Sequence, residues 1–233
     1  MRYYPIFLDL RGRRCVVVGG GKVAERKVVS LLRAKADVRV ISPDLTPRLV
    51  MLAAKKKISV TPRAYRKGDL TTGRAQHVAP LLVFAATDDL QTQQAVREDA
   101  EAVGALVNAA DDRAHSSFLV PASFAQGDLQ VAISTSGASP ALARRLCRQL
   151  QVTLGREYQV YLRFLRQARK QILKSVPTQD KRARVFRQLA GGLRLDWFRA
   201  GAPRRAGNEI GKLLRKLSVK ARSLEGRKSK GEI

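Results

Sequence analysis

Residues 15–27 read Cys15-Val16-Val17-Val18-Gly19-Gly20-Gly21-Lys22-Val23-Ala24-Glu25-Arg26-Lys27. A short β-branched run ends in three glycines and continues with helix-forming residues, which predicts a strand, a tight turn and a helix. Gly19, Gly21 and Ala24 occupy the small-residue positions of the dinucleotide-binding pattern G-x-G-x-x-G/A. They respectively permit the turn, admit the pyrophosphate to the backbone, and pack the helix onto the strand. A plain strand–helix turn is the alternative, but the flanking elements favour nucleotide binding.

The composition is that of a strongly basic globular protein. The 233 residues are 45% hydrophobic and carry a formal net charge of +26. Residues 151–233 hold 22 Lys and Arg against 6 Asp and Glu, so the C-terminal part carries most of the excess. Such a surface attracts nucleic acid, anionic lipid or a polyanionic small molecule, and charge alone does not choose among them.

Other sequence features indicate a soluble cytoplasmic protein. Cys15 and Cys147 form neither a disulfide framework nor a metal-binding motif. The N-terminus has no signal-peptide pattern, and no apolar run is long enough to span a membrane.

The hydrophobic pattern of residues 1–113 predicts alternating strands and helices. Strands are expected at 14–18, 38–41, 58–61, 81–86 and 106–108, and helices at 22–35, 45–57 and 91–103. Because the strands are apolar runs separated by helices, we expect an α/β fold with a Rossmann-type parallel sheet.

The pattern changes after residue 113. Strands at 118–124 and 129–134 are expected to pair antiparallel in a small α+β domain. Ser139 and Pro140 are suited to cap and begin a helix that runs to about residue 154. Further helices, broken near Gly155 and Pro177, predict a helical C-terminal domain. The basic last residues are expected to be disordered.

Seven short motifs, in this order, resemble those of the precorrin-2 dehydrogenase family, a module that also forms the N-terminal part of sirohaem synthase. The motifs are 4–10 (YPIFLDL), 19–24 (GGGKVA), 85–89 (AATDD), 107–112 (VNAADD), 117–122 with Ser117-Phe118 and Pro121-Ala122, 132–135 (AIST), and 139–144 (SPALAR). The resemblance covers about residues 1–150 and fades in the C-terminal third.

The resemblance implies NAD-dependent oxidation of precorrin-2 to sirohydrochlorin, by a protein that is usually a homodimer. Some family members also insert ferrous iron to give sirohaem. The corresponding division is an NAD-binding domain at 1–113, a dimerisation domain at 114–150, a helical domain at 151–222 and a basic tail at 223–233.

The resemblance places Asp111 at the family's important acidic position. The desaturation requires a proton to leave the macrocycle, and a carboxylate at the carboxyl end of a parallel strand is suited to act as the general base. The alternative is that Asp111 or Asp112 caps the following segment.

Cofactor-binding residues are expected in and just beyond the turns after three strands and at the end of a fourth: Gly19, Gly21, Lys22, Val23, Pro43, Asp44, Thr87, Asp88 and Asn108. A solvated loop is the alternative for Thr87 and Asp88, and backbone satisfaction for Asn108. Dinucleotide sites usually carry an acid at the tip of the second strand, where this chain has Ser42. No arginine replaces that acid at the tip, so we expect NAD as the cofactor.

The substrate expectation takes precorrin-2 from the resemblance, and the metal expectation follows from the spacing of the histidines. Precorrin-2 carries acetate and propionate arms, which suit basic side chains and helix N-termini. The expected substrate-binding residues are Ser134, Thr135, Ser136 and Arg144, although the family usually has a glycine at the position of Ser136. His77 and His115 lack metal-ligand spacing, so no resident metal site is expected.

A second hypothesis is an NAD-binding regulatory or nucleic-acid-binding protein. Basic residues such as Lys212, Arg215 and Lys220 fit one helix face, but no aromatic residues or nucleic-acid-binding motifs accompany them. An ordinary small-metabolite dehydrogenase is less favoured, because the usual catalytic His or Tyr arrangement is missing.

Overall fold

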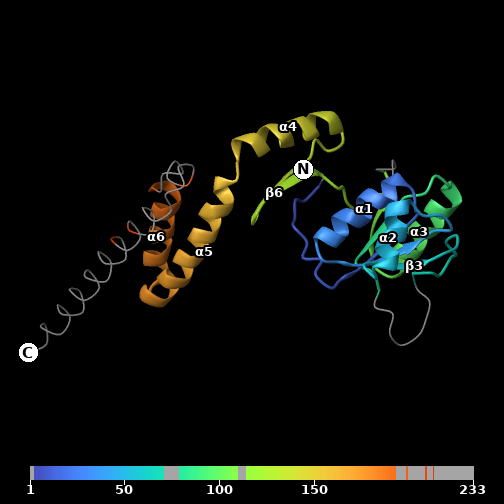
Figure 1. Ribbon diagram of the computed structural model, residues 1–233, viewed down its shortest axis with the longest axis horizontal. Helices are drawn as coiled ribbons and strands as arrows, with labels where there is room; N and C mark the ends of the chain where they lie inside the picture. The colour runs from blue at the N-terminus through green and yellow to red at the C-terminus, as the bar shows by residue number, and fades with distance from the viewer. Residues whose placement is uncertain are drawn as a thin grey trace, which may run out of the picture. The chain divides into compact units, whose positions relative to one another are not determined.

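The computed structural model describes residues 3–70, 79–109 and 114–192, together with Phe198, Asn208 and Lys212. The chain divides into two compact units, Met1–Val120 and Pro121–Ile233 (Figure 1). The finer division predicted at residues 113, 150 and 222 stays a prediction.

The first unit is a parallel sheet with flanking helices, as predicted. Its elements are β1 (Arg14–Val18), α1 (Lys22–Arg33), β2 (Asp37–Ile41), α2 (Pro47–Ala54), β3 (Ser59–Thr61), β4 (Leu82–Ala85), α3 (Leu90–Ala102) and β5 (Leu106–Ala109). The strand order is β3-β2-β1-β4-β5, and every pairing is parallel. This is the Rossmann-type arrangement, with β1 at the centre.

Helix α2 is shorter than the predicted span of 45–57. The Thr46 hydroxyl accepts the Leu49 N–H at 3.3 Å, and Pro47 occupies the first helical turn, so the helix begins there. The helix ends at Ala54, and Lys56 beyond it has a φ of +53°. That left-handed conformation is incompatible with continuing a right-handed helix.

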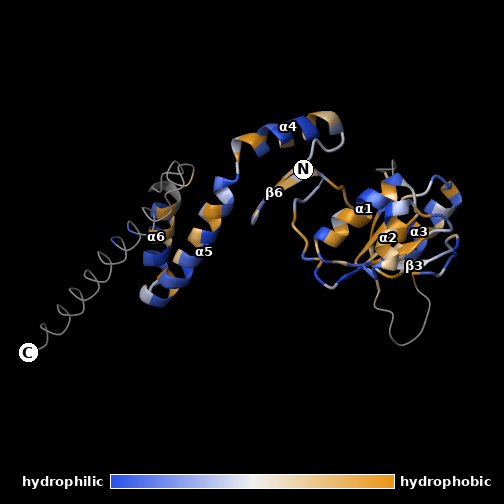
Figure 2. Cartoon of the chain, in the orientation of Figure 1, coloured by the Kyte–Doolittle hydropathy of each residue, from blue (hydrophilic) through white to orange (hydrophobic). Residues whose placement is uncertain are grey.

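Two apolar layers hold the sheet between its helices. Ala24 and Val28 of α1 and Leu49 of α2 pack against one face of the sheet. Val96 and Ala100 of α3 belong to the layer on the other face. This two-sided burial explains the apolar runs of the central strands β1 and β4. Figure 2 shows the hydropathy of these elements.

The second unit joins a hairpin to helices. Strands β6 (Ala122–Gln126) and β7 (Leu129–Ile133) pair antiparallel, and α4 (Pro140–Thr153) packs on them. Helices α5 (Glu157–Ser175) and α6 (Gln179–Gly192) pack on each other. Ser139 caps α4 and accepts the Leu142 N–H at 3.2 Å, as predicted.

The expected strand at 118–124 begins later, at Ala122. Phe118 instead packs edge-on against Phe84 of β4, with ring centroids 5.5 Å apart. The free energy gained by packing the Phe118 ring in the first unit outweighs the preference of this segment for an extended strand. None of the described helices has the length and apolar character needed to cross a membrane.

Candidate functional site

All five parallel strands end at one edge of the sheet, and most of the predicted cofactor residues lie there. The last strand residues are Val18, Ile41, Thr61, Ala85 and Ala109. From β1 the chain adds β2 and β3 on one side of the sheet and then β4 and β5 on the other. The boundary between β1 and β4 is therefore the switch point at which open α/β sheets bind ligands.

Gly19 and Gly20 are fixed between the turns that follow β2 and β4. Gly19 has a φ of +113°, and a Cβ built on it would lie 2.2 Å from the carbonyl oxygen of Ala86. A Cβ on Gly20 would lie 1.9 Å from the carbonyl oxygen of Asp44. The Thr46 N–H donates to the Gly20 carbonyl at 3.0 Å, so the turn after β2 is hydrogen-bonded to the glycines.

Gly20 is a residue whose role the sequence pattern did not reveal. The G-x-G-x-x-G/A pattern leaves its position free, yet the structure excludes a side chain there. The available signal was the middle glycine of the run of three, which the pattern itself does not need.

The N-terminus of α1 is open. Gly21 is its N-cap residue and is exposed, no side chain caps the helix, and no atom would lie within 4 Å of a Cβ on Gly21. The first intrahelical bond runs from the Glu25 N–H to the Gly21 carbonyl at 2.9 Å, so the preceding N–H groups have no helical acceptor. Lys22 is exposed beside this end, and Val23 is half-buried. These features fit a dinucleotide pyrophosphate.

Ala24 is fully buried, which agrees with its expected role in packing the helix onto the sheet. The neighbouring Glu25, half-buried in the first turn of α1, has an oxygen, Oε2, that is buried without a hydrogen-bond partner. Its other oxygen lies 3.7 Å from Nη1 of Arg48 on α2. This long ion pair links the first turns of α1 and α2.

Ser42 is turned inward at the tip of β2. It is buried, and its hydroxyl donates to the Asp44 carbonyl at 2.8 Å. The same hydroxyl oxygen would lie 2.8 Å from a Cβ on Gly20, so a longer acidic side chain has no room in that direction. Pro43 and Asp44 are exposed and are the residues of this turn that remain available for a ligand.

The turn after β4 leads into α3. Asp89 caps the helix by accepting the N–H groups of Gln91 and Thr92. The Thr92 hydroxyl also donates to this carboxylate and lowers the pKa of Asp89. The carbonyl of Thr87 accepts the Gln93 amide at 2.6 Å, whereas Asp88 is exposed. Asp88 is therefore the more accessible of the two predicted cofactor residues.

Asn108 is engaged inside the domain. Its Oδ1 accepts from Lys27 Nζ at 3.3 Å, and its Nδ2 donates to the Phe118 carbonyl at 3.0 Å. The side chain is 9% exposed, and Lys27 also lies over the Phe84 ring. These contacts give Asn108 a structural role, and its contact with the cofactor stays a prediction.

The predicted catalytic residue Asp111 lies outside the described residues, as do Asp112 and His77. The described chain on either side is anchored at the end of β5. The Ala109 N–H donates to the Ser116 hydroxyl at 3.0 Å, and the Ser117 N–H donates to the Val107 carbonyl at 2.8 Å. The described residues on both sides of Asp111 in the sequence therefore lie beside β5.

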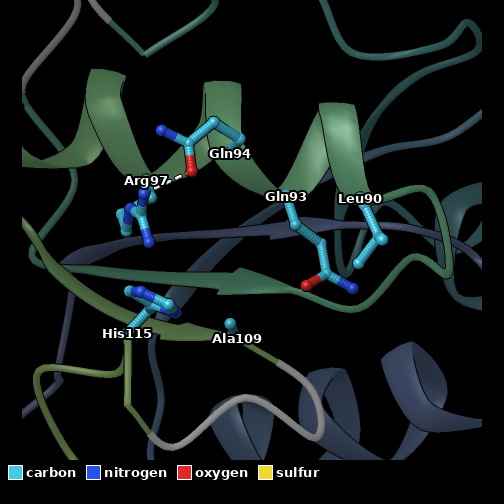
Figure 3. Close-up of a pocket in the computed structure, with 6 residues that line it drawn as sticks. All are labelled: Leu90, Gln93, Gln94, Arg97, Ala109 and His115. Carbon is cyan, nitrogen blue, oxygen red and sulfur yellow. Dashed lines mark hydrogen bonds between the residues drawn. The ribbon is translucent and has the colours of Figure 1, made fainter.

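A pocket of about 240 Å³ lies between α3 and the end of β5 (Figure 3). Its lining consists of Leu90, Gln93, Gln94, Arg97, Ala109 and His115. The structure therefore places His115 at a pocket beside β5. Within the described ranges, no three His, Cys, Asp or Glu side chains gather in a way that would hold a metal ion.

The predicted substrate residues of the second unit form a turn before α4. Ser134 accepts the Ser136 N–H at 3.1 Å, and Thr135 accepts the Ser139 N–H at 3.0 Å. Ser136 has a φ of +49°, a conformation that favours glycine. Ser134, Ser136 and Arg144 are exposed, so the turn offers hydroxyl groups and one cation to a ligand.

Comparisons with known proteins agree with the fold and with NAD(P) binding. A family model described as NAD(P)-binding matches residues 6–122, and a model for the central part of the sirohaem biosynthesis protein matches residues 126–152. A siroheme synthase of Chromobacterium violaceum is 37% identical over 192 residues, which are 82% of this chain and 39% of that protein. One from Neisseria meningitidis serogroup B is 40% identical over 155 residues, 66% of this chain and 30% of that protein.

The chain therefore spans less than half the length of these two relatives. The solved structure of SirC, a precorrin-2 dehydrogenase, matches with a TM-score of 0.71 and 26% identity. That match covers 90% of this chain and all of SirC. These similarities favour the enzyme over the regulatory or nucleic-acid-binding alternative.

Proposed function

We propose that this chain, which belongs to the family of precorrin-2 dehydrogenases and sirohaem synthases, oxidises precorrin-2 to sirohydrochlorin with NAD as the hydride acceptor. The observation that carries the proposal is the open N-terminus of α1 behind a glycine turn that admits no side chain at Gly19 or Gly20. The likeness to SirC along its whole length supports the same reaction.

The chemistry removes two hydrogens from the macrocycle. One leaves with its electron pair for the nicotinamide ring, which is the chemistry that NAD supplies when bound, and the other leaves as a proton. Asp111, which follows the last residue of β5 by two positions in the sequence, accepts this proton as general base. The products are then sirohydrochlorin and reduced cofactor.

The remaining residues bind and orient. The free N–H groups at Gly21, Lys22 and Val23 hold the pyrophosphate, since a helix N-terminus favours anions. Pro43 and Asp44 contact the adenosine end, because both are exposed at the tip of β2. Asn108, through Lys27 and Phe118, steadies the strand that leads to Asp111.

On the nicotinamide side, Thr87 and Asp88 follow β4, next to the glycine turn. In the second unit, Ser134, Thr135, Ser136 and Arg144 bind carboxylate arms of the macrocycle through hydroxyl, N–H and guanidinium donors.

The active form is a homodimer. Leu142, Leu146 and Leu150 recur every four residues along α4 and remain 37–45% exposed. Ala143 and Cys147, on another face of the same helix, are buried. An exposed leucine stripe of this kind is best covered by a second copy of the chain. The cytoplasmic location of the protein stays a prediction.

Iron insertion is a second activity of the family that this chain would share. Ferrous iron would be a substrate, and the macrocycle supplies its nitrogen ligands. Incubating purified protein with sirohydrochlorin and ferrous iron, without NAD, tests this activity separately, and its absence leaves the dehydrogenase proposal intact.

The test of the main proposal is anaerobic incubation of the protein with precorrin-2 and NAD. We expect the absorbance of sirohydrochlorin and of reduced cofactor to rise together. NADP supplied instead should support slower oxidation, and a protein that binds NAD but leaves precorrin-2 unchanged would contradict the assignment.

A further inference from the structure

The pocket beside α3 has no role in the mechanism described above. Figure 3 shows Arg97 on α3 and His115 on the segment after β5 facing each other across it, while Leu90 and Gln93 line the part near the start of α3. Its volume of about 240 Å³ admits a side arm of a large ligand but not a macrocycle.

A chain of polar contacts positions the Arg97 guanidinium. Arg97 donates to the side-chain oxygen of Gln94, whose amide donates to Glu98 at 2.8 Å. Lys67 donates to the other oxygen of Glu98, also at 2.8 Å, and lowers the pKa of that carboxyl. The Glu98 carboxylate is therefore already engaged by Lys67 and Gln94.

Because of this arrangement, Arg97 retains donors for a ligand. Among the described residues, Arg97 donates a hydrogen bond to Gln94, and its charge also acts on the Glu98 carboxylate without a direct ion pair. A guanidinium has five N–H groups in a rigid fork, which matches the two oxygens of a carboxylate. His115 lines the pocket opposite Arg97.

The pocket reaches the carboxyl end of β5, near which the reaction is proposed to occur. Ala109 is the last residue of β5 and lines the pocket, and Asp111 follows two residues later. Gln93, also in the lining, donates to the carbonyl of Thr87 in the turn after β4. Arg97 lies seven residues along α3 from Leu90, about 10 Å from the start of the helix.

We propose that this pocket binds one carboxylate arm of the tetrapyrrole, with the Arg97 guanidinium as the principal donor and His115 beside it. The inference rests on the proposed function, because it takes precorrin-2 and its product as the ligands. Anchoring an arm here would hold the macrocycle near the carboxyl end of β5, which precedes Asp111 by two residues in the sequence.

The test is a binding titration without cofactor. Sirohydrochlorin is added to wild-type protein, Arg97→Gln, Arg97→Lys and the control Arg33→Gln, and the dissociation constant is read from the change in macrocycle absorbance. Arg33 is an exposed cation in the last turn of α1. Arg33→Gln therefore changes the net charge by the same amount as Arg97→Gln, but on a different helix. NAD affinity and the unfolding midpoint of each variant are measured alongside.

We expect Arg97→Gln to weaken sirohydrochlorin binding about tenfold, as for one lost charge-assisted hydrogen bond. Arg97→Lys should recover part of the loss, because it keeps the charge but not the fork. Arg33→Gln should bind normally, and NAD affinity should be unchanged throughout. A macrocycle with esterified arms should bind wild type and Arg97→Gln equally.

Two results would overturn the inference, and they are distinguishable. If wild type oxidises precorrin-2 but Arg97→Gln binds sirohydrochlorin as tightly as wild type, the pocket is not the subsite and the proposed function stands. If wild type neither binds the macrocycle nor oxidises precorrin-2, the proposed function fails and the inference falls with it.

Discussion

At the scale of single residues, Gly20 and Gly21 are neighbours that differ in what an added methyl group would meet. On Gly20 it would collide with the Asp44 backbone, whereas on Gly21 it would enter open space. We therefore expect Gly20→Ala to lower the free energy of unfolding by about 1–3 kcal/mol, the usual cost of overpacking. Gly21→Ala should lower it by no more than about 1 kcal/mol, because only the cap preference changes.

NAD affinity should distinguish Gly21→Ala from wild type even though its stability barely does. The methyl of Gly21→Ala would occupy the approach of the pyrophosphate, so its NAD affinity should fall at least tenfold while the fold survives. Denaturant unfolding and calorimetric titration with NAD measure the two effects. Equal NAD affinity in Gly21→Ala and wild type would show that the phosphates do not lie at α1.

At the scale of elements, the segment after β3 is fastened by two buried carboxylates. Asp69 accepts hydrogen bonds from Nη1 and Nη2 of Arg63, at 2.8 and 2.7 Å, and from the Arg66 N–H at 2.9 Å. Asp99 of α3 accepts from the Tyr65 hydroxyl and the Gly68 N–H. These contacts fix residues 63–69 against the Rossmann unit.

The Arg63–Asp69 pair predicts a pH dependence of stability. The Arg63 guanidinium holds the pKa of Asp69 below its usual 3.8, so the folded state favours the ionised carboxylate. This stabilisation is present above the unfolded-state pKa and is lost as the pH falls through the lower folded pKa. Asp69→Asn should be less stable than wild type by on the order of 1–2 kcal/mol at pH 7.

That stability difference should shrink as the pH falls from 6 to 3, as followed by urea unfolding at each pH. The control is Asp37→Asn on β2. Asp37 pairs with Arg14 and is more exposed than Asp69, so this change should lower the free energy of unfolding little at any pH. A stability difference for Asp69→Asn that is constant with pH would contradict the pairing.

Much of the sheet was predictable, since apolar runs and the glycine turn encode β1, α1 and their neighbours locally. Phe118 was not, because its partner Phe84 lies 34 positions earlier and only the fold brings the rings together. Gly20 was not, because the obstacle is backbone from the turn after β2. The Arg97 pocket combines α3 with a segment beyond β5, and no local pattern marks such a combination.

At the scale of the whole molecule, the leucine stripe of α4 predicts self-association. Replacing Leu146 with glutamate puts a charge in the middle of the stripe without disturbing the buried Cys147 face. Leu146→Glu should therefore sediment as a monomer where wild type sediments as a dimer, with unchanged NAD affinity. The exposed Val152→Glu on the same helix is the control, and a monomeric wild type would remove the basis for the dimer.

The central claim is that this chain transfers a hydride from precorrin-2 to NAD with Asp111 as the base. Its most direct test is an anaerobic single-turnover experiment in which NAD-loaded wild type and Asp111→Ala are each mixed with precorrin-2. Wild type should form one reduced cofactor per sirohydrochlorin, and Asp111→Ala should bind both ligands but form neither product. Near-normal turnover by Asp111→Ala, or none by wild type, would contradict the account.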